Sequence, residues 1–304
     1  MVSPAIYEYL LEFIPKENIL LKEAMDKHTT FRVGGEAEAF VKIDNKEQLG
    51  KIISYLNKTK KEFFVLGNGS NLLVGDKGYK GIVIQISTAM GNVSVNGNLV
   101  TVEAGALLTR VAKAMTEYGL TGLEFAAGIP GTVGGAIVMN AGAYEGEMCQ
   151  VVKSVTIMDR DGNLMELDRD SMEFGYRTSI IKKKPFVVVD VTMELTRGDS
   201  KAIQDKMDDL NARRREKQPL EYASAGSTFK RPEGTFAGKL IMEAGLRGYR
   251  IGGAQVSEKH CGFVVNLGTA TAADVSEVIE VVKEKVKLQT GIDLETEVVY
   301  LGDF

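Results

Sequence analysis

The N-terminal part of the chain has a pattern of apolar and polar positions that predicts a small α/β lobe. Ser3 and Pro4 mark the start of a helix, because serine favours the N-cap and proline the first helical position. Residues 37–43 alternate as in a strand, and residues 62–67 are typical of a short buried strand. The predicted helix between these strands places four apolar side chains on one face: Leu49, Ile52, Ile53 and Leu56.

Beyond Gly81 the pattern is typical of a meandering sheet with one helix. Asn96-Gly97 joins two alternating runs and predicts a hairpin, and Asp161-Gly162 predicts a second one. A helix is expected over residues 107–118, because its apolar positions stop at Gly119, a favoured residue just past a helix end. Residues 185–195 add one more strand, so this middle section is predicted to be α+β.

A charged helix is expected over residues 199–219. Its apolar positions, Ile203, Met207 and Leu210, form only a narrow seam, and Pro219 ends it. Because a helix with so little apolar surface buries little, we expect a domain boundary here.

The C-terminal segment returns to an α/β pattern. Helices are expected over residues 236–244 and 272–288, the second capped by Thr271, with a strand over 261–267 between them. A last strand at 295–302 is expected to return to the first lobe.

Composition narrows the class of protein. The chain has 304 residues and a net charge of −4, which argues against non-specific binding to nucleic acid or membranes. No apolar run approaches the roughly 18 residues of a spanning helix, and no signal-peptide pattern opens the chain. We therefore expect a cytoplasmic protein with neither nucleic acid nor membrane as a partner.

Cysteine and histidine are scarce. Cys149 and Cys261 lie far apart and outside any CxxC spacing, and His28 and His260 are the two histidines. A disulfide framework or a metal site is therefore not expected. A serine hydrolase is also disfavoured, because no GxSxG motif surrounds Ser227.

The turn "VLGNGSNLLVGD" (65–76) directly follows a predicted strand. Its consecutive small residues let main-chain N–H groups converge on an anion, although it matches neither a P-loop nor a Rossmann turn. A pyrophosphate cradle and a tight turn without ligand remain equal alternatives.

The stretch "AAGIPGTVGGAIVMNAGAYEG" (126–146) is nearly uncharged and rich in glycine. Small side chains bury little apolar area, so the stretch suits main chain that lies against a flat, bulky ligand. The alternative is a close crossing of a helix and a strand.

A third stretch, "ASAGSTFKRPEG" (223–234), leaves three roles open for Ser227: nucleophile, phosphate ligand or turn residue.

These stretches, with three others, resemble the UDP-N-acetylenolpyruvoylglucosamine reductase family, flavoproteins that complete UDP-N-acetylmuramate in peptidoglycan synthesis. The matches, in family order over essentially the whole chain, are TTFRVGG (29–35), GNGSNLL (67–73), GIPGTVGGAIVMNAGAYEG (128–146), GYRTS (175–179), AGSTFKRP (225–232) and LETEV (294–298). The resemblance implies an α+β fold with a two-lobed FAD-binding domain of the vanillyl-alcohol-oxidase (PCMH) type and a smaller α/β substrate-binding domain. The expected parts are 1–81 with 296–304 (lobe 1), 82–208 (lobe 2) and 209–295 (substrate domain).

The resemblance also implies non-covalent FAD, with NADPH as the hydride source. Neither His28 nor Cys149 lies in a motif for a covalent flavin link, and His28 is expected to be a turn or capping residue. The implied FAD-binding residues are Arg32, Gly67, Asn68, Gly69, Ser70, Asn71, Gly128, Ile129, Pro130, Gly131, Thr132, Gly134, Gly135, Asn140, Ala141 and Gly142.

The implied catalytic residues are Arg177, Ser227 and Glu297. By resemblance, Arg177 grips the substrate carboxylate, Ser227 donates a proton to the adjacent carbon, and Glu297 stabilises the enolate or relays a proton. Such chemistry needs a cation at the carboxylate and a proton donor at the carbon beside it. Lys217, Lys230 and Arg231 are the implied substrate-binding residues.

The implied substrate is UDP-N-acetylglucosamine enolpyruvate, used by a monomer in cell-wall biogenesis, cell shape and cell division. No tyrosine-bearing insertion follows GYRTS, so the chain resembles the shorter branch of the family. Lys182, Lys183 and Lys184 either face the diphosphate or form a solvated run.

Two other functions are distinguishable from this one. A hydroxy-acid oxidase of the same flavin fold would lack Arg177, Ser227 and Glu297 in their motifs. A nucleotide-sugar-binding protein without redox chemistry would lack the flavin.

Overall fold

The computed structural model describes residues 2–304, which form two compact units built from segments distant in sequence. Unit 1 consists of residues 2–21, Ala39–Asn68 and Gly81–Arg214. Unit 2 consists of Lys22–Glu38, Gly69–Lys80 and Arg215–Phe304. The last boundary falls inside helix α5 (Ser200–Lys217), the charged helix at which a domain boundary was expected. The three-part division with flavin lobes stays a prediction.

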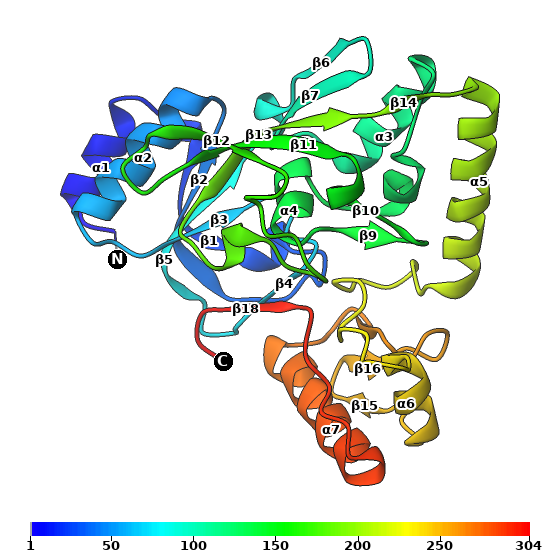
Figure 1. The fold of residues 1–304 in the computed structure, drawn as a ribbon. Helices are drawn as coiled ribbons and strands as arrows, with labels where there is room; N and C mark the ends of the chain where they lie inside the picture. The colour runs from blue at the N-terminus through cyan, green and yellow to red at the C-terminus, as the bar shows by residue number, and fades with distance from the viewer. Residues whose placement is uncertain (1) are drawn as a thin grey trace. The chain divides into compact units, whose positions relative to one another are not determined.

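A four-stranded sheet, most of whose residues belong to unit 1, has the order β1-β2-β5-β3. Its strands are β1 (Ile19–Ala24), β2 (Glu36–Ile43), β3 (Phe63–Leu66) and β5 (Tyr79–Ile86). Helices α1 (Pro4–Leu11) and α2 (Lys46–Lys58) lie together beside it (Figure 1). Ser3 caps α1, and α2 buries the predicted apolar face, so both predicted helices are confirmed. The strand at 63–66 is also confirmed, although only Leu66 in it is fully buried.

The second sheet of unit 1 is antiparallel and five-stranded, in the order β12-β11-β13-β7-β6. Its strands are β6 (Val93–Asn96), β7 (Leu99–Glu103), β11 (Val152–Met158), β12 (Leu164–Asp168) and β13 (Val187–Glu194). Both predicted hairpins are present. The first closes through Gly97-Asn98 rather than Asn96-Gly97, because Asn96 still pairs with Leu99 and Gly97 takes the positive φ.

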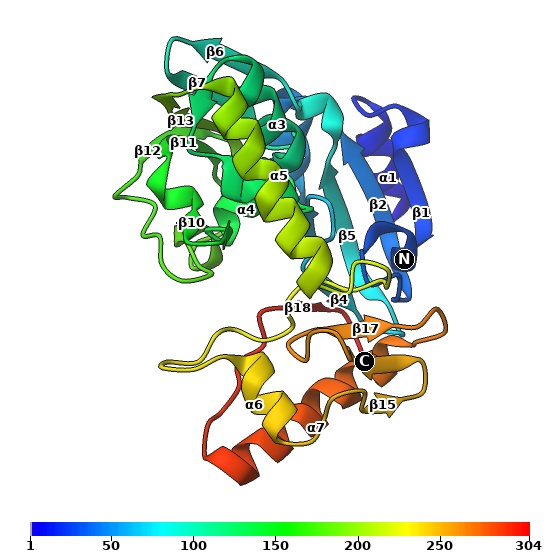
Figure 2. The same ribbon diagram turned by 90° about the vertical axis from the view of Figure 1, so that its right-hand side faces the viewer.

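Three more helices of unit 1 bury apolar side chains: α3 (Leu108–Glu117), α4 (Val133–Val138) and the unit 1 part of α5. Of these, α4 packs on strands β13 and β7 of this sheet. Helix α5 runs alongside α3 (Figure 2), and Ser200 Oγ donates to Thr116 O at 2.8 Å. Ile203 and Met207 are its buried residues, which confirms the narrow seam, whereas Leu210 is only half-buried. Short strand pairs complete the unit: β8 (Leu120–Thr121) with β14 (Thr196–Arg197), and β9 (Gly142–Ala143) with β10 (Gly146–Glu147).

Unit 2 is a smaller α/β body. Strands β15 (Arg250–Ile251), β16 (Ala254–Val256) and β17 (Val264–Asn266) form its sheet, with helices α6 (Ala237–Glu243) and α7 (Ala272–Thr290). Thr271 caps α7 through a capping box with Asp274, as predicted for the cap. The last strand, β18 (Val299–Leu301), pairs in parallel with β4 (Leu72–Val74), which confirms that the chain end returns to the N-terminal segment.

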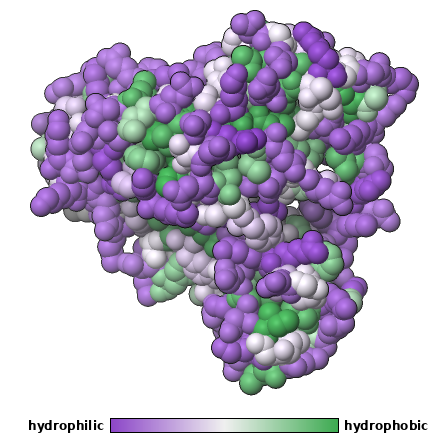
Figure 3. Space-filling view, viewed as in Figure 1, coloured by the Kyte–Doolittle hydropathy of each residue, from purple (hydrophilic) through white to green (hydrophobic). Residues whose placement is uncertain are grey.

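Hydrophilic residues cover most of the face drawn in Figure 3, with hydrophobic residues in small groups between them. Among the helices of residues 2–304, none is both long enough and apolar enough to cross a membrane.

Candidate functional site

The beginning of the GNGSN turn and the glycine-rich stretch touch each other in unit 1. Asn68 Nδ2 donates to Pro130 O at 2.5 Å. A Cβ on Gly67 would overlap Thr132 Oγ1, so this position accepts no larger residue without movement. The structure therefore brings Gly67 and Asn68 against Pro130 and Thr132, two of the residues predicted to bind FAD.

The two neighbouring glycines of α4 have different roles. A Cβ on Gly134 would lie 2.9 Å from Ala104 Cβ, so this glycine permits close packing against the chain, as the crossing alternative predicted. Gly135 is exposed on a helix that otherwise buries most of its residues, and Thr132 Oγ1 accepts from its N–H at 3.2 Å. Of these two glycines, Gly135 is the one whose main chain is exposed.

Arg177 is held against the far end of the glycine-rich stretch. Its Nη2 donates to Gly142 O at 2.9 Å, and Asn140 Nδ2 donates to Gly175 O at 3.1 Å. Asn140 is fully buried and also accepts from Cys149 N at 2.9 Å. Both Asn140 and Arg177 have positive φ, at 41° and 54°. Such conformations persist only where surrounding bonds enforce them, and they concentrate at functional sites.

The second half of the turn belongs to unit 2. Gly69 has φ +62°, and Thr30 N donates to its carbonyl at 3.1 Å. A Cβ on Gly69 would overlap the carbonyl oxygen of His28. TTFRVGG is thus packed on the GNGSN turn, with Arg32 exposed at φ 55°.

His28 ends a short 3-10 helix (Met25–His28), as expected of a turn residue. Its Nε2 lies 3.0 Å from Glu23 Oε1. This hydrogen bond is the main reason that the pKa of Glu23 lies below its ordinary value.

Ser227 and Glu297 lie in two segments that unit 2 joins as a short antiparallel ladder. Phe229 is bridged to Thr296, Lys230 N donates to Glu295 O at 2.8 Å, and Glu297 N donates to Thr228 O at 2.9 Å. Ser227 is exposed and Glu297 is half-buried. The structure therefore pairs the two segments AGSTFKRP and LETEV, which carry two of the three predicted catalytic residues, Ser227 and Glu297. The third, Arg177, lies in unit 1.

The predicted substrate-binding cations differ in their environment. Lys217 is exposed at the end of α5. Lys230 Nζ forms an ion pair with Glu295 Oε2 at 2.8 Å, and the Arg231 guanidinium lies 4.1 Å from the ring centre of Phe236. Lys183 Nζ forms an exposed ion pair with Glu173 Oε2 at 2.6 Å. This contact favours the interpretation of residues 182–184 as a solvated charge run over a role at the diphosphate.

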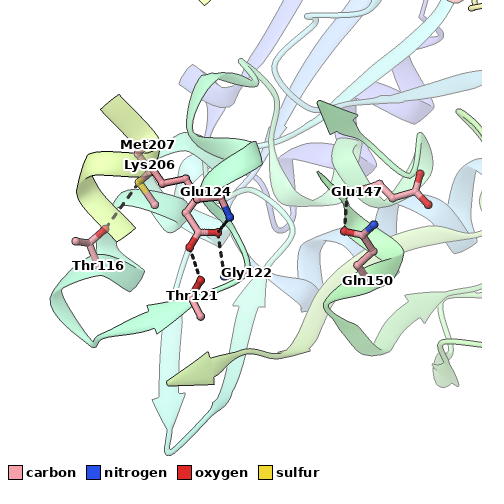
Figure 4. A network of polar contacts seen from close by, with 8 residues as sticks. All are labelled: Thr116, Thr121, Gly122, Glu124, Glu147, Gln150, Lys206 and Met207. Carbon is pink, nitrogen blue, oxygen red and sulfur yellow. Dashed lines mark hydrogen bonds and ion pairs between the residues drawn. The ribbon is translucent and has the colours of Figure 1, made fainter. Parts of the chain in front are cut away.

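A buried carboxylate that the sequence analysis missed supports the start of the glycine-rich stretch. Glu124 is 2% exposed and opens a 3-10 helix, Glu124–Gly128, that runs into this stretch. Thr121 Oγ1 donates to its Oε1, Gly122 N donates to Oε2 at 3.1 Å, and Lys206 Nζ of α5 lies 3.5 Å from Oε2 (Figure 4). The sequence did contain a signal for this residue: a single acid within the apolar run 123–127. An acid in such a run is expected to be buried, and a buried acid is almost always paired.

Burial alone would raise the pKa of Glu124. The hydrogen bonds from Thr121 and from main-chain N–H groups, with the charge of Lys206, outweigh burial and hold the pKa below its ordinary value. The carboxylate is therefore charged at neutral pH.

We expect Glu124→Gln to destabilise unit 1 by about 1–3 kcal/mol at pH 7, because the amide cannot accept from both donors at once. The folded-state pKa of Glu124 is lowered, so its contribution is present above the unfolded value of 4.5 and is lost as the pH falls through the folded value. Urea unfolding at pH 7 and pH 4 should show the gap between wild type and variant narrowing at pH 4. The control is Glu117→Gln, at an exposed acid on α3, which should leave the free energy of unfolding unchanged. The prediction would be contradicted if the difference in stability between wild type and Glu124→Gln were the same at pH 4 as at pH 7.

Each unit offers groups of a kind that FAD requires. In unit 1, Gly135 exposes its main chain, which suits a flat ring. In unit 2, the exposed guanidinium of Arg32 suits a pyrophosphate. Burial raises the pKa of Cys149 to about 11, so its thiol is not a thiolate at neutral pH. No cluster of metal-ligating side chains occurs within residues 2–304.

Comparisons with known proteins match two separate parts of the chain to family models. Residues 37–168 match the family model described as "FAD binding domain", and residues 218–301 match "UDP-N-acetylenolpyruvoylglucosamine reductase, C-terminal domain". The chain is 49% identical to the UDP-N-acetylenolpyruvoylglucosamine reductase of Clostridioides difficile over 100% of both chains, and 50% identical to that of Clostridium perfringens over 97% of each. The crystal structure of the Thermus caldophilus reductase superposes with a TM-score of 0.81 at 35% identity, covering 93% of this chain and 98% of that one.

Proposed function

Because the chain belongs to the UDP-N-acetylenolpyruvoylglucosamine reductase family and is an FAD-dependent oxidoreductase, we propose that it reduces UDP-N-acetylglucosamine enolpyruvate to UDP-N-acetylmuramate with NADPH. The observation that carries this proposal is the relationship over the full chain, which includes both AGSTFKRP and LETEV. The pairing of these two segments in unit 2 supports it, because Ser227 and Glu297 are needed for the same step.

FAD, when bound, supplies the hydride that NADPH provides and that the methylene carbon of the enolpyruvyl group accepts. Arg177 holds the substrate carboxylate, because its planar guanidinium donates to both oxygens and stabilises the charge that develops there. Ser227 gives its hydroxyl proton to the carbon beside the carboxylate, which completes the addition of hydride and proton across the double bond. Glu297 acts at the same place, by stabilising the enolate or by returning a proton to Ser227.

The remaining residues bind rather than react. Lys217, Lys230 and Arg231 are proposed to contact the diphosphate, and the glycine turn, the glycine-rich stretch and Arg32 to hold FAD without a covalent bond. Substrate binding at Lys230 would then compete with its ion pair to Glu295, a weak interaction since the Glu295 side chain is 73% exposed. We propose that the protein works as a monomer in the cytoplasm, where it supplies peptidoglycan precursors for cell-wall biogenesis, cell shape and cell division.

An anaerobic half-reaction experiment tests the function. The purified protein should be yellow, NADPH should bleach its flavin, and the enolpyruvyl substrate should restore the colour with one product formed per flavin. Denaturation should release free FAD, since the flavin is non-covalent. A colourless protein that FAD cannot reconstitute would refute the proposal, as would a flavin that a 2-hydroxy acid reduces and the enolpyruvyl substrate does not reoxidise.

A further inference from the structure

Thr228, the residue after Ser227, is buried and connects the Ser227 segment to two other segments of unit 2 by hydrogen bonds. Its side chain is fully buried, whereas Ser227 is exposed. Its N–H donates to Gly262 O at 2.8 Å, and its Oγ1 accepts from Val264 N at 2.9 Å. Thr228 therefore fixes the segment that carries Ser227 to the loop that leads into β17 with two bonds.

The third bond of Thr228 reaches Glu297. Its carbonyl accepts from Glu297 N at 2.9 Å. Asn71 Nδ2 donates to Glu297 O at 3.1 Å, and Val299 N donates to Asn71 O at 3.0 Å. The main chain of Glu297 is thus held at its N–H by Thr228 and at its carbonyl by a residue of the GNGSN turn.

We propose that Thr228 is a positioning residue for the protonation step: its buried hydroxyl and its main-chain N–H fix the Ser227 segment, and its carbonyl holds the main chain of Glu297. The inference rests on the proposed function, because it assigns that residue pair a common task. The hydroxyl matters because it is the acceptor for the main-chain N–H of Val264, which is buried and needs a partner. Val264 lies two residues after Gly262, whose carbonyl accepts from Thr228 N. Without that acceptor, Thr228 holds the loop only through its N–H bond to Gly262 O, and we expect the Ser227 segment to shift enough to misplace the proton donor.

Small displacements are enough to slow such a step. A misplacement of about 1 Å reduces the rate of a positioned reaction by about a hundredfold. NADPH reduction of the flavin does not use Ser227 or Glu297 in the proposed mechanism. The hydroxyl of Thr228 should therefore affect one half-reaction and spare the other, which loss of general stability would not do.

The test compares Thr228→Val, which keeps the shape and removes the acceptor, with Thr228→Ser, which keeps the acceptor. In anaerobic stopped-flow measurements on the holoenzyme, Thr228→Val should slow reoxidation by saturating enolpyruvyl substrate about tenfold or more. Flavin reduction by NADPH and FAD content should stay close to wild type, and Thr228→Ser should restore reoxidation. Hydrogen exchange should be faster in Thr228→Val for peptides that contain Val264 and Glu297.

Thr290→Val is the matched control, because Thr290 Oγ1 also accepts a main-chain N–H in unit 2, from Ile292 at 3.2 Å, at the end of α7. It should leave both half-reactions unchanged. If Thr228→Val loses its flavin, Thr228→Ala replaces it with the same expected result. Three results would overturn the proposal. In Thr228→Val, these are reoxidation at the wild-type rate or an equal loss of rate in both half-reactions. The third is that Thr290→Val slows reoxidation as much as Thr228→Val does. If the substrate does not reoxidise the reduced wild-type enzyme, the proposed function is refuted instead. The hydrogen-exchange measurement still tests whether Thr228 holds the segments that contain Val264 and Glu297.

Discussion

Ser227→Ala is expected to slow reoxidation of reduced flavin by the enolpyruvyl substrate by about 10²–10⁴-fold, the usual contribution of a positioned proton donor. Alanine removes the hydroxyl and leaves the segment in place, since the bonds that hold it come from Thr228, Phe229 and Lys230. Ser227 is exposed, so its loss leaves no buried group unsatisfied and should cost little stability. Flavin reduction by NADPH should proceed at the wild-type rate.

Rapid-mixing absorbance of the flavin under anaerobic conditions measures the two half-reactions separately. Ser224→Ala, a half-buried serine three residues earlier in the same loop, is the control and should affect neither. An equal loss in both half-reactions would remove the proton-donor role from Ser227. Wild-type reoxidation in Ser227→Ala would assign the proton to another donor.

The fold was predictable where local signals agree with burial. Helix α7 follows from Thr271 as its cap and from the apolar spacing before Gly291, and α2 follows from its single apolar face. The hairpin at Gly97 shows the limit of such signals. Asn96-Gly97 predicts the turn, but Asn96 pairs with Leu99, so the two turn residues are Gly97 and Asn98, one position later. Gly97 takes the positive φ that this turn requires.

For the candidate site, the sequence predicted which segments take part, but it did not predict which residues of these segments contact one another. The motif resemblance predicted Asn71 as a flavin ligand, and the structure shows that its side chain donates to the carbonyl of Glu297, 226 residues away. No local pattern reports a bond over that separation. Glu124 was missed for a related reason: its partners Thr121 and Gly122 are local, but its burial under α5 depends on how distant segments pack.

Gly69→Ala is expected to cost about 2–4 kcal/mol of stability and to weaken FAD binding by about tenfold or more. Two effects add at this position. Gly69 has φ +62°, which strains any residue with a Cβ, and that Cβ would overlap the carbonyl oxygen of His28. Relief requires that the GNGSN turn move away from TTFRVGG, and both segments are proposed to hold FAD. Chemical denaturation and titration of the apoprotein with FAD, followed by flavin fluorescence, measure the two losses.

Gly291→Ala separates these two effects. Gly291 lies in the same unit with φ +75°, and a Cβ there would meet no atom within 4 Å. Its substitution should therefore cost only the strain of the positive φ, about 1 kcal/mol, and leave FAD binding unchanged. The additional loss in Gly69→Ala then measures the overlap with His28. Equal losses in the two variants would mean that the turn yields freely, and wild-type FAD affinity in Gly69→Ala would remove the GNGSN turn from the flavin site.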